Sequence, residues 1–525
     1  MTVLTGYTDE TVSARYRRLI IALLGVAAFA YGAIFALYGT FVLMQLLAPF
    51  AVIAALSVWL LPDTGRAPVR MLDRLLLLFL AVVICWPNYL ALALPGMPWI
   101  TMIRLVAVPL AIVMLMCLST SEHFRAEMKA VLAAAPPIWK LLVAFAVIAF
   151  VSVGVSRDMG ASFSKFIVAQ LYWTLIFFAA CYALSKPGRA TAFVYVLWIG
   201  FIVVALIAVQ EWRHKIIPWA GHVPNFLKVE DELLQKLLTS AGRKATGIYR
   251  LKSVFTTALG LAEYCALSTP FLIHMAVTAR RMGLRVAAVG SIVLAFWVIS
   301  RTDSRLGAVG FFLSFLLYLL AWGAMRWRNR PDSIAGPVIV LTYPAIFCAF
   351  MTASFFVRRL RVMMWGGGAQ QASSDARKGQ IAKGVPQVLS HPWGYGIGQG
   401  SDTLNYRNLA GVPSIDTYYL SVALEYGIIG FLVYYGMFIT AVVIGGRNAL
   451  DAKSDETRLL VPLVISLLIF LIIKSVFSQE SNHPVAFAML GAIVALTYRV
   501  RLEQSPYAAI SRAVRALPAR AAPAE

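Results

Sequence analysis

The chain has 525 residues, of which 60% are hydrophobic and 13% are charged, whereas soluble globular chains carry about a quarter charged residues. This composition excludes an ordinary soluble protein. The formal net charge of +22 would suggest nucleic-acid binding in a soluble chain, but here the basic residues lie in short loops between apolar runs and at both ends. We therefore assign them to membrane topology and expect no nucleic-acid partner. The five cysteines lie singly in apolar runs, without the spacing of a metal site or a disulfide framework.

Apolar runs of about 18–22 residues recur along the whole chain, and about 20 helical residues cross a hydrocarbon core of about 30 Å. The sequence therefore predicts an all-α, polytopic membrane bundle of about 14 transmembrane helices. We expect one membrane domain over residues 1–500 and a disordered, basic cytoplasmic tail over residues 501–525. The predicted spans are 19–37, 40–61, 74–94, 102–118, 139–155, 165–184, 192–210, 254–277, 283–300, 306–324, 336–355, 417–440, 459–477 and 483–499.

Lys and Arg are concentrated in alternate short loops between these spans. Cytoplasmic loops carry an excess of both residues, so the alternation predicts that these loops and both termini are cytoplasmic. The basic loops lie at 66–74, 125–140, 186–189, 280–285, 326–330, 447–458 and 499–501. Two long loops, 211–253 and 356–416, are then external, and loops of such length are usually functional or disordered. We expect them to be ordered, with short helices at 229–238 and 381–389.

Several arginines lie at the outer ends of predicted spans, where the positive-inside tendency would not place them. Guanidinium groups bind phosphate through paired, planar hydrogen bonds, so several converging arginines suit a diphosphate. The alternative is that each one reaches toward lipid headgroups. The short hairpin 301–305, which holds two arginines and an aspartate between two spans, favours an anion site. The outer arginines are Arg250, Arg301, Arg305, Arg358, Arg359 and Arg361.

A glycine-rich stretch, His391–Gly400, lies in the second long loop. Alternating glycines also occur in dinucleotide-binding turns, but those follow a strand in a βαβ unit, which this chain lacks. Glycine allows tight turns and close approach of the backbone to another group. We therefore expect this stretch to approach a bulky ligand closely.

A polar segment containing Ser414 and Asp416 leads into the predicted span 417–440. Either residue is a suitable N-cap for that helix, because a side-chain oxygen there accepts a backbone hydrogen bond. The carboxylate of Asp416 is also suited to act as a base toward a substrate hydroxyl. The sequence leaves both interpretations open.

Four of these segments, in chain order, together resemble the O-antigen ligase and polymerase superfamily of bacterial envelope enzymes. They are 249–255, 304–308, 391–398 and 416–430, and they cover about the second half of the chain. The resemblance implies a metal-independent glycosyltransferase without a cofactor, acting at the outer face of the bacterial inner membrane. Its implied partners are an undecaprenyl-diphosphate-linked glycan donor, a glycan acceptor, the lipid bilayer and a chain-length regulator or export machinery.

Carried over by position, the resemblance makes Arg250 and Arg305 the diphosphate-binding catalytic arginines. Asp416 is added as a third catalytic residue on its own chemistry, as a candidate base. The other outer arginines would bind substrate together with Lys252, His391 and Tyr418. Ligases that transfer O-antigen to lipid A-core have a histidine where this chain has Asp416. This departure favours a polymerase of an exopolysaccharide or O-antigen repeat unit and leaves the ligase as the alternative.

A transporter or flippase of lipid-linked sugars is the competing class, since it would also be basic and many-spanning. Transporters usually carry ionisable residues near the bilayer midplane and broken helices in two related repeats. Glu263 is the main ionisable residue of this kind here, and no two halves of the chain correspond. A purely structural membrane protein would leave the outer arginines unexplained.

Overall fold

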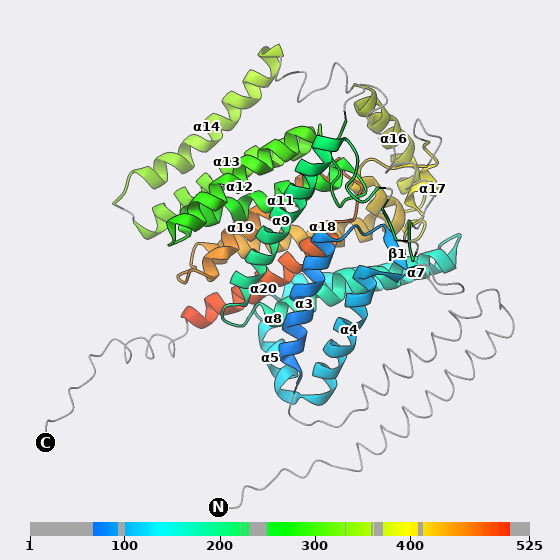
Figure 1. Ribbon diagram of the computed structural model, residues 1–525, viewed down its shortest axis with the longest axis horizontal. Helices are drawn as coiled ribbons and strands as arrows, with labels where there is room; N and C mark the ends of the chain where they lie inside the picture. The colour runs from blue at the N-terminus through cyan, green and yellow to red at the C-terminus, as the bar shows by residue number, and fades with distance from the viewer. Residues whose placement is uncertain are drawn as a thin grey trace, which may run out of the picture.

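The computed structural model describes residues 67–92, 100–220, 222–224, 226–229, 249–330, 332–358, 361, 371–407 and 413–504. Figure 1 shows that the described part is a bundle of long helices. Ten of its helices are long and apolar enough to cross a membrane, which confirms a polytopic helical membrane protein. The predicted spans 19–37 and 40–61 and the tail beyond Gln504 lie outside the described residues, so the count of about 14 stays a prediction.

The helices fall close to the predicted spans. In chain order they are α3 (Val69–Cys85), α4 (Met102–Thr120), α5 (Glu122–Leu132), α6 (Pro136–Gly154), α7 (Met159–Ala169), the π-helix η1 (Gln170–Thr174), α8 (Leu175–Ala183), α9 (Arg189–His214), α11 (Ala258–Thr278), α12 (Met282–Arg301), α13 (Arg305–Asn329), α14 (Ala335–Phe356), α16 (Gln371–Ser390), α17 (Gly400–Leu404), α18 (Tyr418–Ala449), the 3-10 helix η2 (Thr457–Leu459), α19 (Leu460–Lys474) and α20 (His483–Gln504). The predicted span 74–94 is shifted most, because α3 ends at Cys85, just before Trp86-Pro87. Proline disfavours a helical residue before it and cannot donate a backbone hydrogen bond.

Three short strands depart from the all-α prediction. Strand β1 (Leu90–Leu92) pairs antiparallel with β2 (Ile100–Thr101) on one side and with β3 (Leu227–Val229) on the other. The predicted amphipathic helix at 229–238 therefore begins at the end of a strand, and its other residues lie outside the described part. The sheet joins the chain after α3 to the chain after α9.

The short helix α5 is amphipathic and was not among the predicted spans. It buries Phe124, Met128 and Val131, at the spacing that puts three side chains on one helical face. Ser121 caps it, because its Oγ accepts a hydrogen bond from the backbone N–H of Phe124 at 3.2 Å. Because only one face of α5 is apolar, the helix as a whole is too polar to be predicted as a transmembrane span.

Helix α20 lies at the centre of the bundle. Nearly every side chain from His483 to Thr497 is buried. The helix packs against α8, α18 and α19, and more lightly against α5 and α3. Helix α14, by contrast, packs mainly against α13 and lies at the edge of the bundle (Figure 1).

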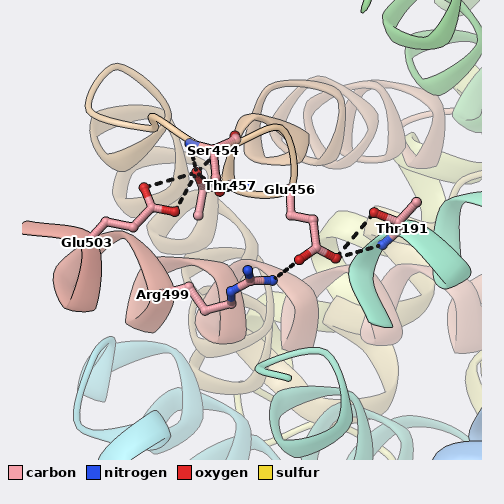
Figure 2. A network of polar contacts seen from close by, with 6 residues as sticks. All are labelled: Thr191, Ser454, Glu456, Thr457, Arg499 and Glu503. Carbon is pink, nitrogen blue, oxygen red and sulfur yellow. Dashed lines mark hydrogen bonds and ion pairs between the residues drawn. The ribbon is translucent and has the colours of Figure 1, made fainter. Parts of the chain in front are cut away.

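One end of the bundle is held together by polar contacts between the ends of helices and the segment that precedes α19 (Figure 2). The carboxylate of Glu456 accepts hydrogen bonds from Arg499 Nη1 at 2.5 Å and from Thr191 Oγ1 at 3.2 Å. Nearby, Thr457 Oγ1 donates to Glu503 at 3.3 Å. Burial alone would raise the pKa of Glu456, but a hydrogen bond from the Gly188 backbone and the Arg499 guanidinium hold it below its ordinary value. We call this the ion-paired end of the bundle.

Further ion pairs at the ion-paired end link other loops. They are Arg189–Asp73 at 2.9 Å, Lys186–Glu127 at 2.7 Å, Arg280–Asp455 at 2.7 Å and Arg328–Asp451 at 2.6 Å. All of these contacts join segments that the alternation of basic residues assigns to one side of the membrane. The opposite end, which holds the start of α11, the α12–α13 turn and the starts of α18 and α20, is called the distal end below.

Candidate functional site

A buried carboxylate at the distal end fixes the segment that precedes α11. Glu211, in the last turn of α9, is fully buried. It accepts hydrogen bonds from Tyr249 Oη at 2.8 Å and from the backbone N–H groups of Lys252 at 3.1 Å and Ser253 at 2.7 Å. These bonds satisfy the carboxylate and hold Arg250 and Lys252 on either side of the buried Leu251.

Arg250 lies against the turn between α12 and α13. Its Nε donates a hydrogen bond to the carbonyl oxygen of Thr302 at 2.7 Å, and the N–H of Leu251 donates to the carbonyl oxygen of Arg301 at 3.2 Å. Ser304 caps α13, since its Oγ accepts from the N–H of Gly307 at 3.1 Å. The turn therefore brings Arg301 and the half-buried Arg305 beside the segment that carries Arg250.

Two further cations complete this group. Lys215, which follows α9 in a left-handed conformation, has its Nζ 2.8 Å from the centre of the Trp212 ring. The guanidinium carbon of Arg301 is 4.4 Å from the centre of the same ring. Local desolvation and the Arg301 charge lower the pKa of Lys215. Burial lowers the pKa of Lys252. The Glu211 carboxylate opposes this shift, and the nearby Arg250 charge adds to it.

Like charges this close repel one another, and an anion bound among these cations would relieve that repulsion. We call them the cationic cluster: Lys215, Arg250, Lys252, Arg301 and Arg305. A diphosphate bound there could accept hydrogen bonds from both the guanidinium groups of the arginines and the ammonium groups of the lysines. The group is suited to stabilise a phosphate leaving group as it gains charge.

The glycine-rich loop lies against a break in α18. Gly427 has φ 70° and ψ −173° inside that helix, which frees backbone groups on both sides of it. The N–H of Tyr395 donates to Leu424 O at 2.8 Å, and the N–H of Ile428 donates to Pro392 O at 2.9 Å. A Cβ on Gly394, which has φ 86°, would lie 2.6 Å from the carbonyl oxygen of Glu425. The glycines therefore allow a close approach of this loop to the broken helix, and its approach to a ligand stays a prediction.

Asp416 lies beside α16 at the distal end. Its backbone N–H donates to Gln380 Oε1 at 2.9 Å. Burial raises the pKa of its carboxyl group, and the Arg377 guanidinium and a Gln380 hydrogen bond oppose that rise only in part. The N-cap of α18 is Thr417, so the interpretation of Asp416 or Ser414 as the helix cap is wrong. A raised pKa makes the Asp416 carboxylate a stronger base than an ordinary aspartate.

Residues 276–435 match a family model described as O-antigen ligase. This match over part of the chain supports a relation to the O-antigen ligase and polymerase superfamily. The matched family implies a glycosyl-transferring enzyme of the ligase or polymerase type with lipid-linked glycans as substrates. No curated protein matches the chain. The matched segment contains the α12–α13 turn, the glycine-rich loop and Asp416, whereas Arg250 and Lys215 precede it.

Other residues predicted for the superfamily site lie away from the cationic cluster. Arg358 and Arg361 are exposed at the end of α14, and within the described residues no hydrogen bond or ion pair joins them to the cluster. Arg359 lies outside the described residues. His391 is exposed, and its Nδ1 shares a hydrogen bond with Tyr395 Oη at 2.7 Å. Tyr418 is buried in the core, with its ring centre 4.7 Å from that of His483.

Sequence reasoning singled out Glu263 but missed three other charged residues at the distal end, Lys165, Lys474 and Glu480. Lys165 Nζ lies 2.9 Å from Glu480 Oε2, and Lys474 Nζ lies 2.8 Å from Glu263 Oε1, with both members of the second pair fully buried. A charged residue inside an apolar span was the available signal, because such residues are costly unless they are paired. The sequence did not show which charges pair, since the partners come from different helices.

Proposed function

We propose that this protein is a polymerase that joins undecaprenyl-diphosphate-linked repeat units into a cell-surface polysaccharide at the outer face of the bacterial inner membrane. The cationic cluster is the observation that carries the proposal. Arg250 contacts the turn that carries Arg301 and Arg305, and Lys215 and Arg301 contact the same Trp212 ring at this end of the bundle. Such a group suits a lipid diphosphate better than isolated arginines at a lipid surface would.

In the proposed reaction, a hydroxyl group of the acceptor attacks the anomeric carbon of the donor sugar. A new C–O bond forms there while the bond between that carbon and the diphosphate oxygen breaks. The diphosphate leaves with the bonding electron pair, and the cationic cluster stabilises its growing negative charge. The hydroxyl proton passes to a base, for which Asp416 is the proposed group because burial raises its pKa.

The polymerase is preferred over the ligase because Asp416 stands where lipid A-core ligases have a histidine. The ligase stays as a second candidate, since the matching family model is described as O-antigen ligase. Deleting the gene in its native host and measuring the chain length of every surface glycan separates the two. We expect loss of long chains with single repeat units retained. Loss of transfer to the lipid core would indicate a ligase, and unchanged glycans would contradict both.

Two features of the bundle bear on the transporter alternative. The buried Lys474–Glu263 pair joins the end of α19 to the second turn of α11, so it lies near the distal end and not at mid-helix. The backbone groups on both sides of the break at Gly427 form hydrogen bonds with the glycine-rich loop. Neither feature provides the midplane ionisable site that a transporter would use.

We further propose that both termini and the ion-paired end are cytoplasmic and that the distal end is external, as the basic loops indicate. In a background without native cysteines, an impermeant thiol reagent applied to intact spheroplasts should label Lys378→Cys, an exposed position on α16. It should leave Lys453→Cys, an exposed position at the ion-paired end, unlabelled until the membrane is opened. The reverse pattern would invert the proposed orientation.

A further inference from the structure

A cavity of about 270 Å³, lined by both apolar and polar side chains, lies at the distal end, outside the cationic cluster. It is enclosed by the residues around the start of α4, by α7 and η1, and by the loop between α19 and α20. The side chains that the argument uses are Asn88, Lys165, Tyr172, Trp173, Glu480 and Ser481. The cavity is several times the roughly 30 Å³ that one water molecule occupies in the liquid, so it has room for a larger molecule.

Two polar atoms on the cavity wall are buried and unsatisfied. Within the described residues, neither Asn88 Oδ1 nor Ser481 Oγ has a hydrogen-bond partner. Buried polar atoms in folded proteins nearly always have one, and an orphaned atom beside a cavity indicates a missing polar partner. A ligand that carries hydroxyl groups would satisfy both atoms.

The ion pair on the cavity wall is open to a ligand. Lys165 Nζ and Glu480 Oε2 are 2.9 Å apart, but the two side chains remain 37% and 30% exposed. An ammonium group has three donors and a carboxylate has several acceptor sites, so one mutual contact leaves capacity on both sides. The pair can donate to one hydroxyl group and accept from another.

Aromatic side chains form another part of the wall, at an irregular place in the helix. The π-helix η1 interrupts the run from α7 to α8, and such single-turn insertions are frequent at functional sites. It carries Tyr172 and Trp173, and the Trp173 ring is held from behind by Phe487, with centroids 5.4 Å apart and planes 4° apart. An aromatic surface beside hydrogen-bonding groups matches a sugar ring, which has apolar C–H faces and a rim of hydroxyl groups.

The cavity adjoins the segment that carries the cationic cluster. Gln479, next to Glu480, accepts a hydrogen bond from Thr257 Oγ1, in the stretch between Lys252 and α11. On the other wall, Tyr89, next to Asn88, accepts from Trp219 Nε1 at 2.9 Å in the loop that follows Lys215. Both walls therefore continue into the segments that hold the cations.

We propose that this cavity is a subsite for one sugar ring of a lipid-linked glycan, separate from the cationic cluster that binds the diphosphate. The inference rests on the proposed function, because it assigns the glycan part of the same substrates. The shared chemistry is a ring with free hydroxyl groups. It can belong to the donor or to the acceptor, and the kinetic measurement below separates the two.

A binding measurement tests the subsite without the reaction. The probe is the oligosaccharide that mild acid releases from the host's own lipid-linked repeat units, labelled at its reducing end. Equilibrium dialysis against the full chain in nanodiscs should show binding by the wild type. Glu480→Gln and Asn88→Ala should each weaken it about tenfold, the effect of losing a hydrogen bond to a charged or buried partner.

The controls separate the subsite from the rest of the enzyme. Arg250→Ala should bind this phosphate-free probe as the wild type does. Glu456→Gln, the same substitution in the network of Figure 2 at the ion-paired end, should also leave binding unchanged. Wild-type affinity in both cavity variants, at matched thermal stability, or no binding of the probe by the wild type, would overturn the inference.

Steady-state kinetics assign the sugar to one substrate. Donor and acceptor concentrations are varied separately, and the substrate whose KM rises about tenfold in Glu480→Gln supplies the sugar that occupies the cavity. If the wild type forms no polymer, the proposed function fails. If the wild type forms polymer and both cavity variants keep its two KM values, only the subsite fails.

Discussion

Alanine in place of Arg305 is expected to slow polymer formation about ten- to a hundredfold, because a charge-assisted contact of about 1.5–3 kcal/mol to the leaving diphosphate is lost. Arg250→Ala should cost as much, and it also removes the Nε hydrogen bond to Thr302 that positions the turn. The measurement is polymer formed in vitro from purified lipid-linked repeat units. EDTA is present throughout, since we propose that the reaction needs no metal.

Lysine should not restore either arginine well, because it keeps the charge but loses the two-pronged geometry. The matched control is Arg280→Ala, an exposed arginine that pairs with Asp455 at the ion-paired end, and it should retain wild-type output. Near-normal polymer from either alanine variant of the cationic cluster, at equal protein level, would refute the diphosphate assignment.

Asparagine in place of Asp416 is expected to lower the rate about a hundredfold to ten-thousandfold, the usual cost of losing general-base assistance. The amide keeps the shape and can still face Arg377 and Gln380, but it cannot accept the proton. The pKa of Asp416 is raised by burial, and the carboxylate is the active form. Wild-type activity should therefore fall as the pH drops through this raised pKa, at a higher pH than for an ordinary aspartate.

Asp416→Ala should slow polymer formation as much as Asp416→Asn does, while the thermal stability of both proteins stays unchanged. Asp402→Asn, on the exposed face of α17, is the matched control and should keep wild-type rates. Wild-type rates in the Asp416→Asn protein would exclude the base role, and departure of the diphosphate would then have to precede deprotonation of the acceptor.

The membrane helices could be predicted from the sequence because one physical requirement, an apolar run as long as the bilayer is thick, determines each of them. The same criterion cannot detect α5, whose apolar residues cover a single face. It also cannot detect the break in α18, because Gly427 lies within an otherwise continuous apolar run. The strands β1 and β3 were missed since their pairing depends on segments far apart in the chain.

The candidate site could be predicted in part. The hairpin 301–305 suggested converging arginines, and the hydrogen bond from Arg250 to Thr302 does bring that arginine to the hairpin. Lys215 was missed, because a lysine just after a helix end looks like any interfacial residue until its contact with Trp212 is seen. The cap interpretation of Asp416 was wrong because α18 begins one residue later than such a cap would require. Hydrogen bonds between separate helices, such as these, have no periodic signal in the sequence.

The position of α20 has a consequence for how the protein is made. The helix that α8, α18 and α19 surround is the last of the described helices to leave the ribosome. Arg499, near its end, supplies the guanidinium that Glu456 holds at the ion-paired end. The earlier helices are therefore synthesised before the helix against which their inner faces pack. The described bundle is thus completed only when α20 moves into the middle of helices already in the membrane.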